Sequence, residues 1–386
     1  MTDDSTNNPN TQTRKASAQE NHSSRRGFLK ASAALGAGAI LGAPYIGNAQ
    51  TSQGVRWRMQ SAWQPGTIGY RTFETWCRSI PELTSGELSI EPFAAGAVAG
   101  TFEMADAVRS GVLDGMNWFT VYWPGKMPAG VFMSAYPMAL GLPHHWDMMF
   151  DSFGGREIVD ELYDRQGLVF LGHVQHDLNL IHSKVPLRSF DDFQGKRIRF
   201  PGGIVAETFA KVGVRTTLLP GGDVYPALER GTIDAADFVG PAVNYDLGFH
   251  QVADYIIMGP PSTPCLHQPV DLMDISVNKR SWSRISEQTQ KLMYKLVKAY
   301  SAEHYAAIQK ANHAAWPKYK EAGVEVIHLS EEDAARFREA AIPLWFEWAN
   351  KDRDAARLFK VHLQVMQDPS VAVITPDDIK DHKLNF

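Results

Sequence analysis

The sequence predicts an α/β protein with two lobes that close like a clamshell over a ligand. The main observation is a phrase that occurs twice, at residues 107–118 and 227–238, with Gly111 and Gly231 in register. Each copy reads as a helix end, a glycine cap and a short apolar strand. A second observation is that strands alternate with helices along the chain, which predicts parallel sheets. The alternative is a chance similarity between two helix–glycine–strand units.

The strand of each copy ends in a polar residue followed by an aromatic one. These are Asn117 and Trp118 in the first copy, and Asp237 and Phe238 in the second. In open α/β sheets, ligands bind beyond the carboxyl ends of the strands. We therefore expect a ligand between two lobes that each present such a strand end.

The other elements follow in regular order. Strands are expected at residues 55–62, 86–92, 112–118, 168–173, 196–200 and 271–278, and helices at 70–80, 101–110 and 205–212. From residue 281 onward the chain reads as mostly helical, at 288–341 and 345–366, and we interpret this end as a brace or an oligomer contact. The predicted segments are a signal peptide at 1–49, lobe I at 50–175 with a return segment at about 270–330, lobe II at 176–269, and a helical C-terminal region at 331–386 that is a candidate dimer contact.

The N-terminus has the features of an export signal. Arg25 and Arg26 precede an Ala/Gly-rich apolar stretch at residues 31–46, and small residues at 47–49 offer a cleavage site. This order is typical of a twin-arginine signal, which exports folded protein. The apolar stretch is shorter than the roughly 20 residues that a spanning helix needs, so cleavage is favoured over anchoring. The alternative is a basic tail on a cytosolic protein. We predict a soluble protein of the periplasm.

Composition limits the partners and leaves the cysteines open. The formal net charge is −5 at pH 7, which argues against a nucleic-acid partner. Cys77 and Cys265 are the only cysteines. They can pair in an oxidising compartment or remain as two buried thiols.

Arg199 is the first candidate for ligand binding. It lies on a short predicted strand directly before Pro201-Gly202, a turn that would leave its guanidinium near the interface of the lobes. A guanidinium matches a carboxylate or sulfonate with two parallel hydrogen bonds. The alternative is a solvated surface arginine. Several aromatic residues could wall a small pocket or pack in the core: Trp63, Trp118, Tyr122 and Trp123.

Asp177 and Asp237 flank the predicted cleft. Paired carboxylates can act as acid and base, bind a cation or hold a ligand amine, and each aspartate can also simply cap a turn. His173, His176 and His182 cluster in the sequence. The His-x-x-His spacing of His173 and His176 lacks a third partner at a known metal spacing, so we expect these histidines to lie at the surface.

No sequence motif of a nucleophile, a catalytic zinc, a phosphate loop or a dinucleotide site is present. We therefore predict a binding protein that requires no cofactor. The distant alternative is an exported hydrolase or lyase that uses Asp177 and Asp237.

Several phrases resemble one known family. They are KRIRFPG at 196–202, LPGGDVYPALE at 219–229, GTIDAADFVGP at 231–241 and GFH at 248–250. They are similar to the DctP-type extracytoplasmic receptors of tripartite ATP-independent periplasmic (TRAP) transporters, in the branch named for α-keto acids and chloroaromatic or mannitol-type solutes. The resemblance covers nearly the whole mature chain. It implies a periplasmic-binding-protein clamshell with a hinge and a long connecting helix. It also implies delivery of a small organic anion to the small and large membrane subunits, and C-terminal helices that can form a homodimer.

The resemblance assigns roles to particular residues. The arginine that clamps the ligand carboxylate falls on Arg199, and an asparagine and a glutamine of the branch fall on His173 and Asp177. Two glutamates of the branch fall on Asp237 and Gln268. In α-keto acid receptors, the glutamine and the two glutamates help to hold a cation that bridges to the ligand. The resemblance thus admits a single cation, sodium or calcium, at Asp177, Asp237, Phe238 and Gln268.

The departures from the family pattern leave the solute open. Asp177 and Asp237 supply two negative charges and Arg199 one positive charge, so a cation or a ligand ammonium is expected beside the anion. The solute is predicted to be a carboxylate such as a 2-oxo acid, with a sulfonate or an amino-acid-like zwitterion as the alternative. The predicted ligand-binding residues are Arg199, His173, Asp177, Asn117, Trp118, Tyr122 and Phe238.

Overall fold

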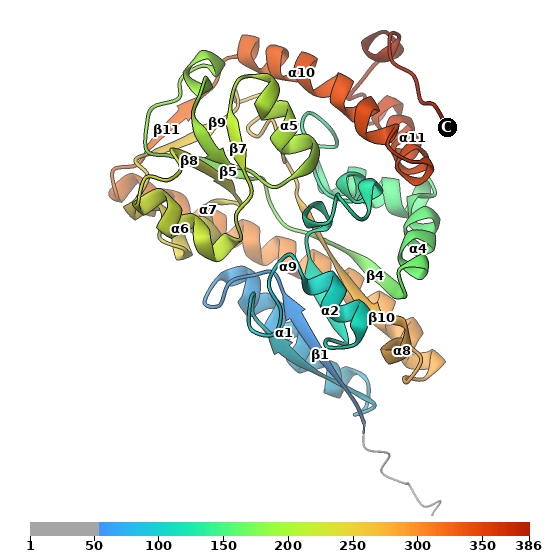
Figure 1. The fold of residues 1–386 in the computed structure, drawn as a ribbon. Coiled ribbons are helices and arrows are strands. Elements are labelled where there is room, and N and C mark those ends of the chain that lie inside the picture. The colour runs from blue at the N-terminus through green and yellow to red at the C-terminus, as the bar shows by residue number, and fades with distance from the viewer. Residues whose placement is uncertain (1–53) are drawn as a thin grey trace, which may run out of the picture. The chain divides into compact units, whose positions relative to one another are not determined.

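A computed structural model describes residues 54–386, and the predicted signal peptide at 1–49 lies outside these residues. The fold contains two β-sheets (Figure 1). The first sheet has the order β2-β1-β3-β10-β4, and the second has the order β11-β9-β5-β8-β6-β7. The strands of the first sheet are β1 (Val55–Ser61), β2 (Leu88–Phe93), β3 (Gly115–Trp118), β4 (Leu168–Gln175) and β10 (Leu272–Asn278). Those of the second are β5 (Leu180–Ser183), β6 (Arg197–Arg199), β7 (Arg215–Thr217), β8 (Ala235–Phe238), β9 (Tyr255–Met258) and β11 (Glu325–His328).

Helices connect and flank the two sheets. They are α1 (Ile68–Leu83), α2 (Met104–Ser110), α3 (Pro143–Asp147), α4 (Gly155–Arg165), α5 (Gly203–Lys211), α6 (Gly221–Glu229), α7 (Pro241–Asp246), α8 (Lys279–Trp282), α9 (Glu287–Glu321), α10 (Glu331–Ala349) and α11 (Arg353–Gln367), with short 3-10 turns η1 (Thr120–Tyr122) and η2 (Pro128–Met133). Within residues 54–386, none of them combines the length and apolarity needed to cross a membrane.

Both copies of the repeated phrase fold in the same way. The capping glycines are left-handed, with φ of 84° at Gly111 and 68° at Gly231. Asp114 then accepts a hydrogen bond from a backbone N–H of β1, and Asp234 accepts one from β6, both at 2.8 Å. The strands β3 and β8 therefore start at equivalent positions beside equivalent neighbours. The two copies therefore share their local geometry as well as their sequence.

The expectation of purely parallel sheets is wrong for two strands. β10 runs antiparallel to β3 and β4, and β5 runs antiparallel to β8 and β9. The chain passes from the first sheet to the second between β4 and β5, and returns between β9 and β10. A parallel neighbour needs a long crossover connection within one sheet, whereas a strand that arrives directly from the other sheet can pair antiparallel. The lobe boundaries at these two passages remain a prediction.

The long predicted helix at 288–341 is interrupted. α9 ends at Glu321, Gly323 has a φ of 78°, and β11 then pairs in parallel with β9 before α10 begins. β11 lies inside the return segment that we assigned to the first lobe, yet it joins the second sheet. α9 itself contacts elements of both sheets, β4 of the first and α7 beside the second, as a brace would.

The C-terminal helices fold back on the rest of the chain. The indole of Trp345 in α10 donates a hydrogen bond to the Pro137 carbonyl, and that of Trp348 donates to Glu207 of α5. In α11, the ring of His362 bonds to the Phe132 carbonyl. Figure 1 shows α10 beside α5 and α11 near α4. The apolar faces of these helices are thus covered by their own chain.

Candidate ligand-binding site

A small cavity of about 20 Å³ lies where strands of both sheets end. Its walls come from the residues after β1 and β3 of the first sheet, from the ends of β6 and β8 of the second, and from the two passages between the sheets. The lining residues are Ala62, Trp63, Gln64, Phe119, Val121, Tyr122, Asn179, Arg199, Pro201, Phe238, Val239 and Asp271. The location is the one that the repeated strand ends predict.

Arg199 is buried at the end of β6, with 2% of its surface exposed. Its Nε donates to the carbonyl of Leu219 at 3.1 Å, and its Nη1 donates to the carbonyl of Asp237 at 3.0 Å. Its guanidinium carbon lies 5.2 Å from the centre of the Phe238 ring. Nη2 is buried and has no hydrogen-bond partner. A buried guanidinium donor without a partner is costly unless a ligand supplies an acceptor.

Aromatic rings form part of the cavity wall. Trp63 packs edge to face on Phe119, and Phe119 packs in the same manner on Tyr122. Burial raises the pKa of the Tyr122 phenol, although the neighbouring Arg199 lowers it. Tyr122 is therefore a neutral hydroxyl beside the guanidinium and can donate to an anion.

Asp237 is fully buried and paired with His267, which we did not predict as a site residue. Its Oδ1 lies 2.8 Å from Nε2 of His267, and its Oδ2 lies 3.4 Å from Nη1 of Arg199. Burial raises the pKa of Asp237, against the opposing effects of His267 and Arg199. Burial lowers the pKa of His267, but Cys265 and Asp237 outweigh burial and raise it to about 10. The raised pKa of His267 favours its protonated form next to Asp237.

Both carboxylate oxygens of Asp177 also have hydrogen-bond partners in the protein. Its Oδ1 lies 2.8 Å from Nδ1 of His176 and accepts the backbone N–H of Gly240 at 3.2 Å, and its Oδ2 accepts Nδ2 of Asn312 at 2.6 Å. Burial lowers the pKa of His176, but hydrogen bonds to Asp177 and Asp271 outweigh burial and raise it to about 9. Asp177 does not line the cavity.

The acid that does line the cavity is Asp271, which the sequence did not single out. Its Oδ2 accepts Nε2 of Gln268 at 2.9 Å and lies 3.6 Å from Nε2 of His176. Its Oδ1 accepts the backbone N–H of Leu272 and the hydroxyl of Ser134.

These contacts correct the charge balance that we expected. Three buried aspartates face one arginine and two histidines with raised pKa values. The protein's own groups therefore supply positive charge beside the acids. We had expected a cation or a ligand ammonium to supply this charge.

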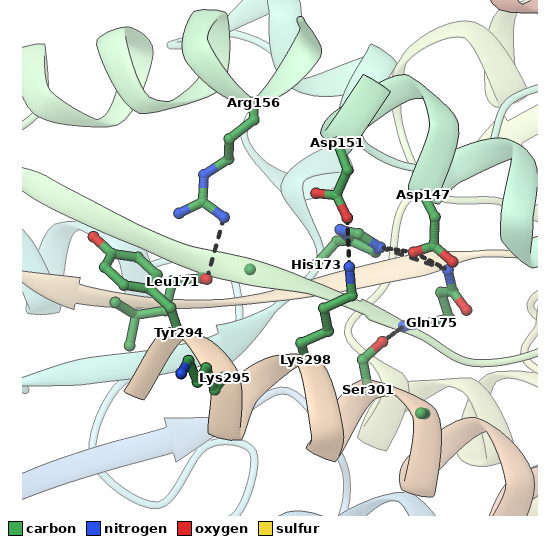
Figure 2. Close-up of a pocket in the computed structure, with 12 residues that line it drawn as sticks. Asp147, Asp151, Arg156, Leu171, His173, Gln175, Tyr294, Lys295, Lys298 and Ser301 are labelled. Atoms are coloured by element: carbon green, nitrogen blue, oxygen red, sulfur yellow. Dashed lines mark hydrogen bonds and ion pairs between the residues drawn. The ribbon is translucent and has the colours of Figure 1, made fainter. Parts of the chain in front are cut away.

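The surface position predicted for the histidines is wrong. His176 and His182 have no exposed surface, because each ring finds a partner in the interior. His182 accepts Nδ2 of Asn244 at 3.0 Å, and burial lowers its pKa to about 3. His173 lies in a different pocket, of about 310 Å³, between β4 and α9. Figure 2 shows its ring beside Asp147, with an Nε2–Oδ1 distance of 2.9 Å.

The structure therefore brings together only part of the predicted set. Arg199, Tyr122 and Phe238 meet at the cavity. Asn117 and Trp118 are buried in the first sheet and bond to Asp274 of β10. No sequence signal pointed to Asn179, Gln64 or Asp271. The two cysteines are buried and unpaired with one another.

The side chains proposed for a cation already have protein partners. The oxygens of Asp177 and Asp237 already receive donors from the protein, and Oε1 of Gln268 accepts Nδ2 of Asn179 at 3.0 Å. Phe238 lines the cavity, but no three His, Cys, Asp or Glu side chains within residues 54–386 are grouped so that they could hold a metal ion.

Comparisons with known proteins agree with the fold. A monocarboxylate 2-oxoacid-binding periplasmic protein of Nostoc sp. is 26% identical over 300 residues, which cover 77% of this chain and 80% of that protein. A TRAP periplasmic solute-binding protein of Rhodobacter sphaeroides, solved in an open form without ligand, is 28% identical with a TM-score of 0.63 and covers 82% of this chain and 99% of its own. A TRAP solute-binding protein of Bordetella bronchiseptica, a dimer with calcium and picolinate in one active site, is 25% identical with a TM-score of 0.74 and covers 85% of this chain and 96% of its own.

Two family models match the sequence itself. The twin-arginine translocation signal matches residues 22–42. The model of bacterial extracellular solute-binding proteins, family 7, matches residues 59–352, which is most of the chain. The chain therefore belongs to bacterial extracellular solute-binding protein family 7, the DctP family of TRAP transporter receptors, and its twin-arginine signal directs it to the periplasm.

Proposed function

We propose that this receptor binds a small monocarboxylate in the cavity between its two sheets and delivers it to the membrane subunits of a TRAP transporter. The observation that carries the proposal is Nη2 of Arg199, a buried guanidinium donor that faces the cavity without a partner. The neutral hydroxyl-bearing side chain of Tyr122 lines the same cavity. Together they offer the donors that a carboxylate accepts.

The cavity favours a ligand of only a few heavy atoms. About 20 Å³ is little more than the roughly 10–15 Å³ that one water needs. The ring wall of Trp63, Phe119 and Tyr122 suits the apolar end of such an acid. The relative from Nostoc, a monocarboxylate 2-oxoacid-binding periplasmic protein, supports a monocarboxylate. A sulfonate presents the same charge to Arg199 and is the second candidate.

One arrangement near the site resembles catalytic machinery. Sγ of Cys265 lies 3.6 Å from Nδ1 of His267, whose Nε2 contacts Asp237. Cys265 is not among the residues that line the cavity of Arg199, however, and Asp237 is paired with Arg199 as well. A thiol outside the lining of the proposed anion site supports a receptor rather than a hydrolase.

A homodimer through the C-terminal helices remains a prediction. The Bordetella relative forms a dimer. Sedimentation velocity of the mature chain and of a chain truncated before α11 would test it.

A thermal-shift screen tests the proposed function. The mature protein is heated with small monocarboxylates, the matching sulfonates and the uncharged amides of the same acids. A true ligand at 100 times its dissociation constant stabilises the fold by about 2.7 kcal/mol. We expect stabilisation by monocarboxylates and none by the amides. Equal stabilisation by acids and amides would overturn the assignment of an anion clamp.

A further inference from the structure

A chain of three side chains fixes how Asn179 faces the cavity. The carboxylate of Asp271 accepts Nε2 of Gln268 at 2.9 Å, so Oε1 of Gln268 points the other way. That Oε1 accepts Nδ2 of Asn179 at 3.0 Å. Because a carboxylate only accepts, this order of donors and acceptors determines the orientation of both amides. Oδ1 of Asn179 is consequently the atom left without a donor.

The backbone holds this relay in place. The two passages between the sheets run side by side, and the Asn179 N–H donates to the Gln268 carbonyl at 3.0 Å. The Asp271 N–H donates to the Asp177 carbonyl, also at 3.0 Å. Asn179 is buried, with 5% of its surface exposed. The relay therefore presents Oδ1 from a rigid position.

The cavity thus contains unmatched groups of two kinds. Nη2 of Arg199 is a donor without an acceptor, whereas Oδ1 of Asn179 and Oε1 of Gln64 are acceptors without a donor. All three residues line the cavity. A carboxylate satisfies only the arginine. A buried acceptor that stays unpaired in the complex weakens binding, so a matching ligand must also bring a hydrogen-bond donor.

The acidic side chains near the cavity also have protein partners in place of a metal ion. Asp177 and Asp237 each lie 2.8 Å from a histidine ring nitrogen, and Asp177 accepts Asn312 in addition. The carboxylate oxygens that could coordinate a cation are therefore engaged by protein donors.

Resting on the proposed function, we propose that the ligand is a small monocarboxylate that carries a donor, a hydroxyl or an ammonium, next to its carboxylate, and that it binds without a metal ion. The carboxylate pairs with Arg199 and the donor with Asn179. A 2-oxo acid of the same skeleton presents an acceptor to Asn179 instead and binds more weakly.

The test is calorimetry with lactate, alanine and pyruvate, which share one carbon skeleton, in buffer with and without chelator. We expect lactate or alanine to bind at least about tenfold more tightly than pyruvate, with no effect of chelator or added calcium. Tighter binding of lactate would identify the donor as a hydroxyl, and tighter binding of alanine as an ammonium. Pyruvate binding as tightly as both others, or binding that requires calcium, would overturn the proposal and leave the carboxylate receptor standing.

Two variants test whether Asn179 and Gln64 cause the preference over pyruvate. Asn179→Leu should erase the preference over pyruvate by weakening the donor-bearing ligand selectively. Gln64→Met, which leaves the relay intact, should reduce the preference in the same direction. If none of the three acids binds, the wider set of monocarboxylates decides: a ligand without a donor overturns the proposal, and a ligand with one supports it. If no monocarboxylate binds at all, the proposed function itself fails.

Discussion

Asp274 gives a sharp test of how burial sets protonation in this fold. It lies in β10, an interior strand of the first sheet between β3 and β4, and is 2% exposed. Its Oδ2 accepts the indole N–H of Trp118 at 3.1 Å and the hydroxyl of Tyr163 at 2.6 Å, while Oδ1 has no partner. Burial raises the pKa of Asp274 from 3.8 to about 7, although the neighbouring Tyr163, Ser276 and Trp118 side chains oppose it. No lysine, arginine or histidine forms a salt bridge with it within residues 54–386.

The sign of the effect follows from the raised pKa. Between pH 4 and pH 7 the folded protein holds a proton on Asp274 that the unfolded chain releases, so the free energy of unfolding falls as the pH rises through this window. Above pH 7 the loss is complete, and the difference between 3.8 and about 7 corresponds to about 4 kcal/mol. Asp274→Asn removes the titration. Its amide can still accept from Trp118, and it can donate to the hydroxyl of Ser276, which is buried without a partner.

Urea unfolding from pH 4 to pH 9, followed by tryptophan fluorescence, measures this difference. Relative to the parent, Asp274→Asn should gain stability steadily as the pH rises, by a few kcal/mol in total. Asp164→Asn, at an exposed carboxylate, is the matched control and should track the parent. A difference between Asp274→Asn and the parent that stays flat from pH 4 to pH 9 would refute the reasoning.

Three further predictions concern Gly240, the buried His176 and export. Gly240→Ala should lose anion binding, because its Cβ would lie 1.9 Å from the carboxylate of the neighbouring aspartate, whereas Gly222→Ala, with open space around it, should bind like the parent in calorimetry. The pKa of His176 is raised to about 9 in the folded protein, so its ion pair stabilises the fold fully below pH 6.5 and progressively less up to pH 9. His176→Gln should therefore reduce the fall in the free energy of unfolding between pH 6.5 and pH 9, measured by urea unfolding. An unchanged fall over this range would contradict the prediction. Replacing both Arg25 and Arg26 by lysine should leave the protein in the cytoplasm, and normal amounts of the variant in a periplasmic extract would show another export route.

The sequence predicted those parts of the site that a local pattern encodes. Arg199 sits at a strand end before a Pro-Gly turn, and the repeated phrase located the edge of the sheet at which it lies. Phe238 and Tyr122 follow from the same rule, since each comes at or just after a strand of the repeat.

The rest of the site depends on segments that meet only in the folded chain. Asn179 and Gln268 are far apart in sequence and face each other because the two passages between the sheets run together. His267 reaches Asp237 through the same passage. β5 pairs antiparallel with β8, and β10 pairs antiparallel with β3, for the same reason: each follows a passage from the other sheet. No periodicity or spacing in the sequence reports which passage lies beside which, so the charge balance of the site could not be predicted.

Calorimetry on two arginines of the same strand tests the central claim most directly. Arg199 points into the cavity, whereas Arg197, two residues earlier on β6, pairs with Asp234 at the surface. With the monocarboxylate that stabilises the parent most, Arg199→Ala should weaken binding by about 100-fold or more, close to 3 kcal/mol, because the anion loses its charged donor. Arg197→Ala should bind like the parent. If circular dichroism shows both variants folded and Arg199→Ala binds as tightly as Arg197→Ala, the carboxylate is held elsewhere and the account is contradicted.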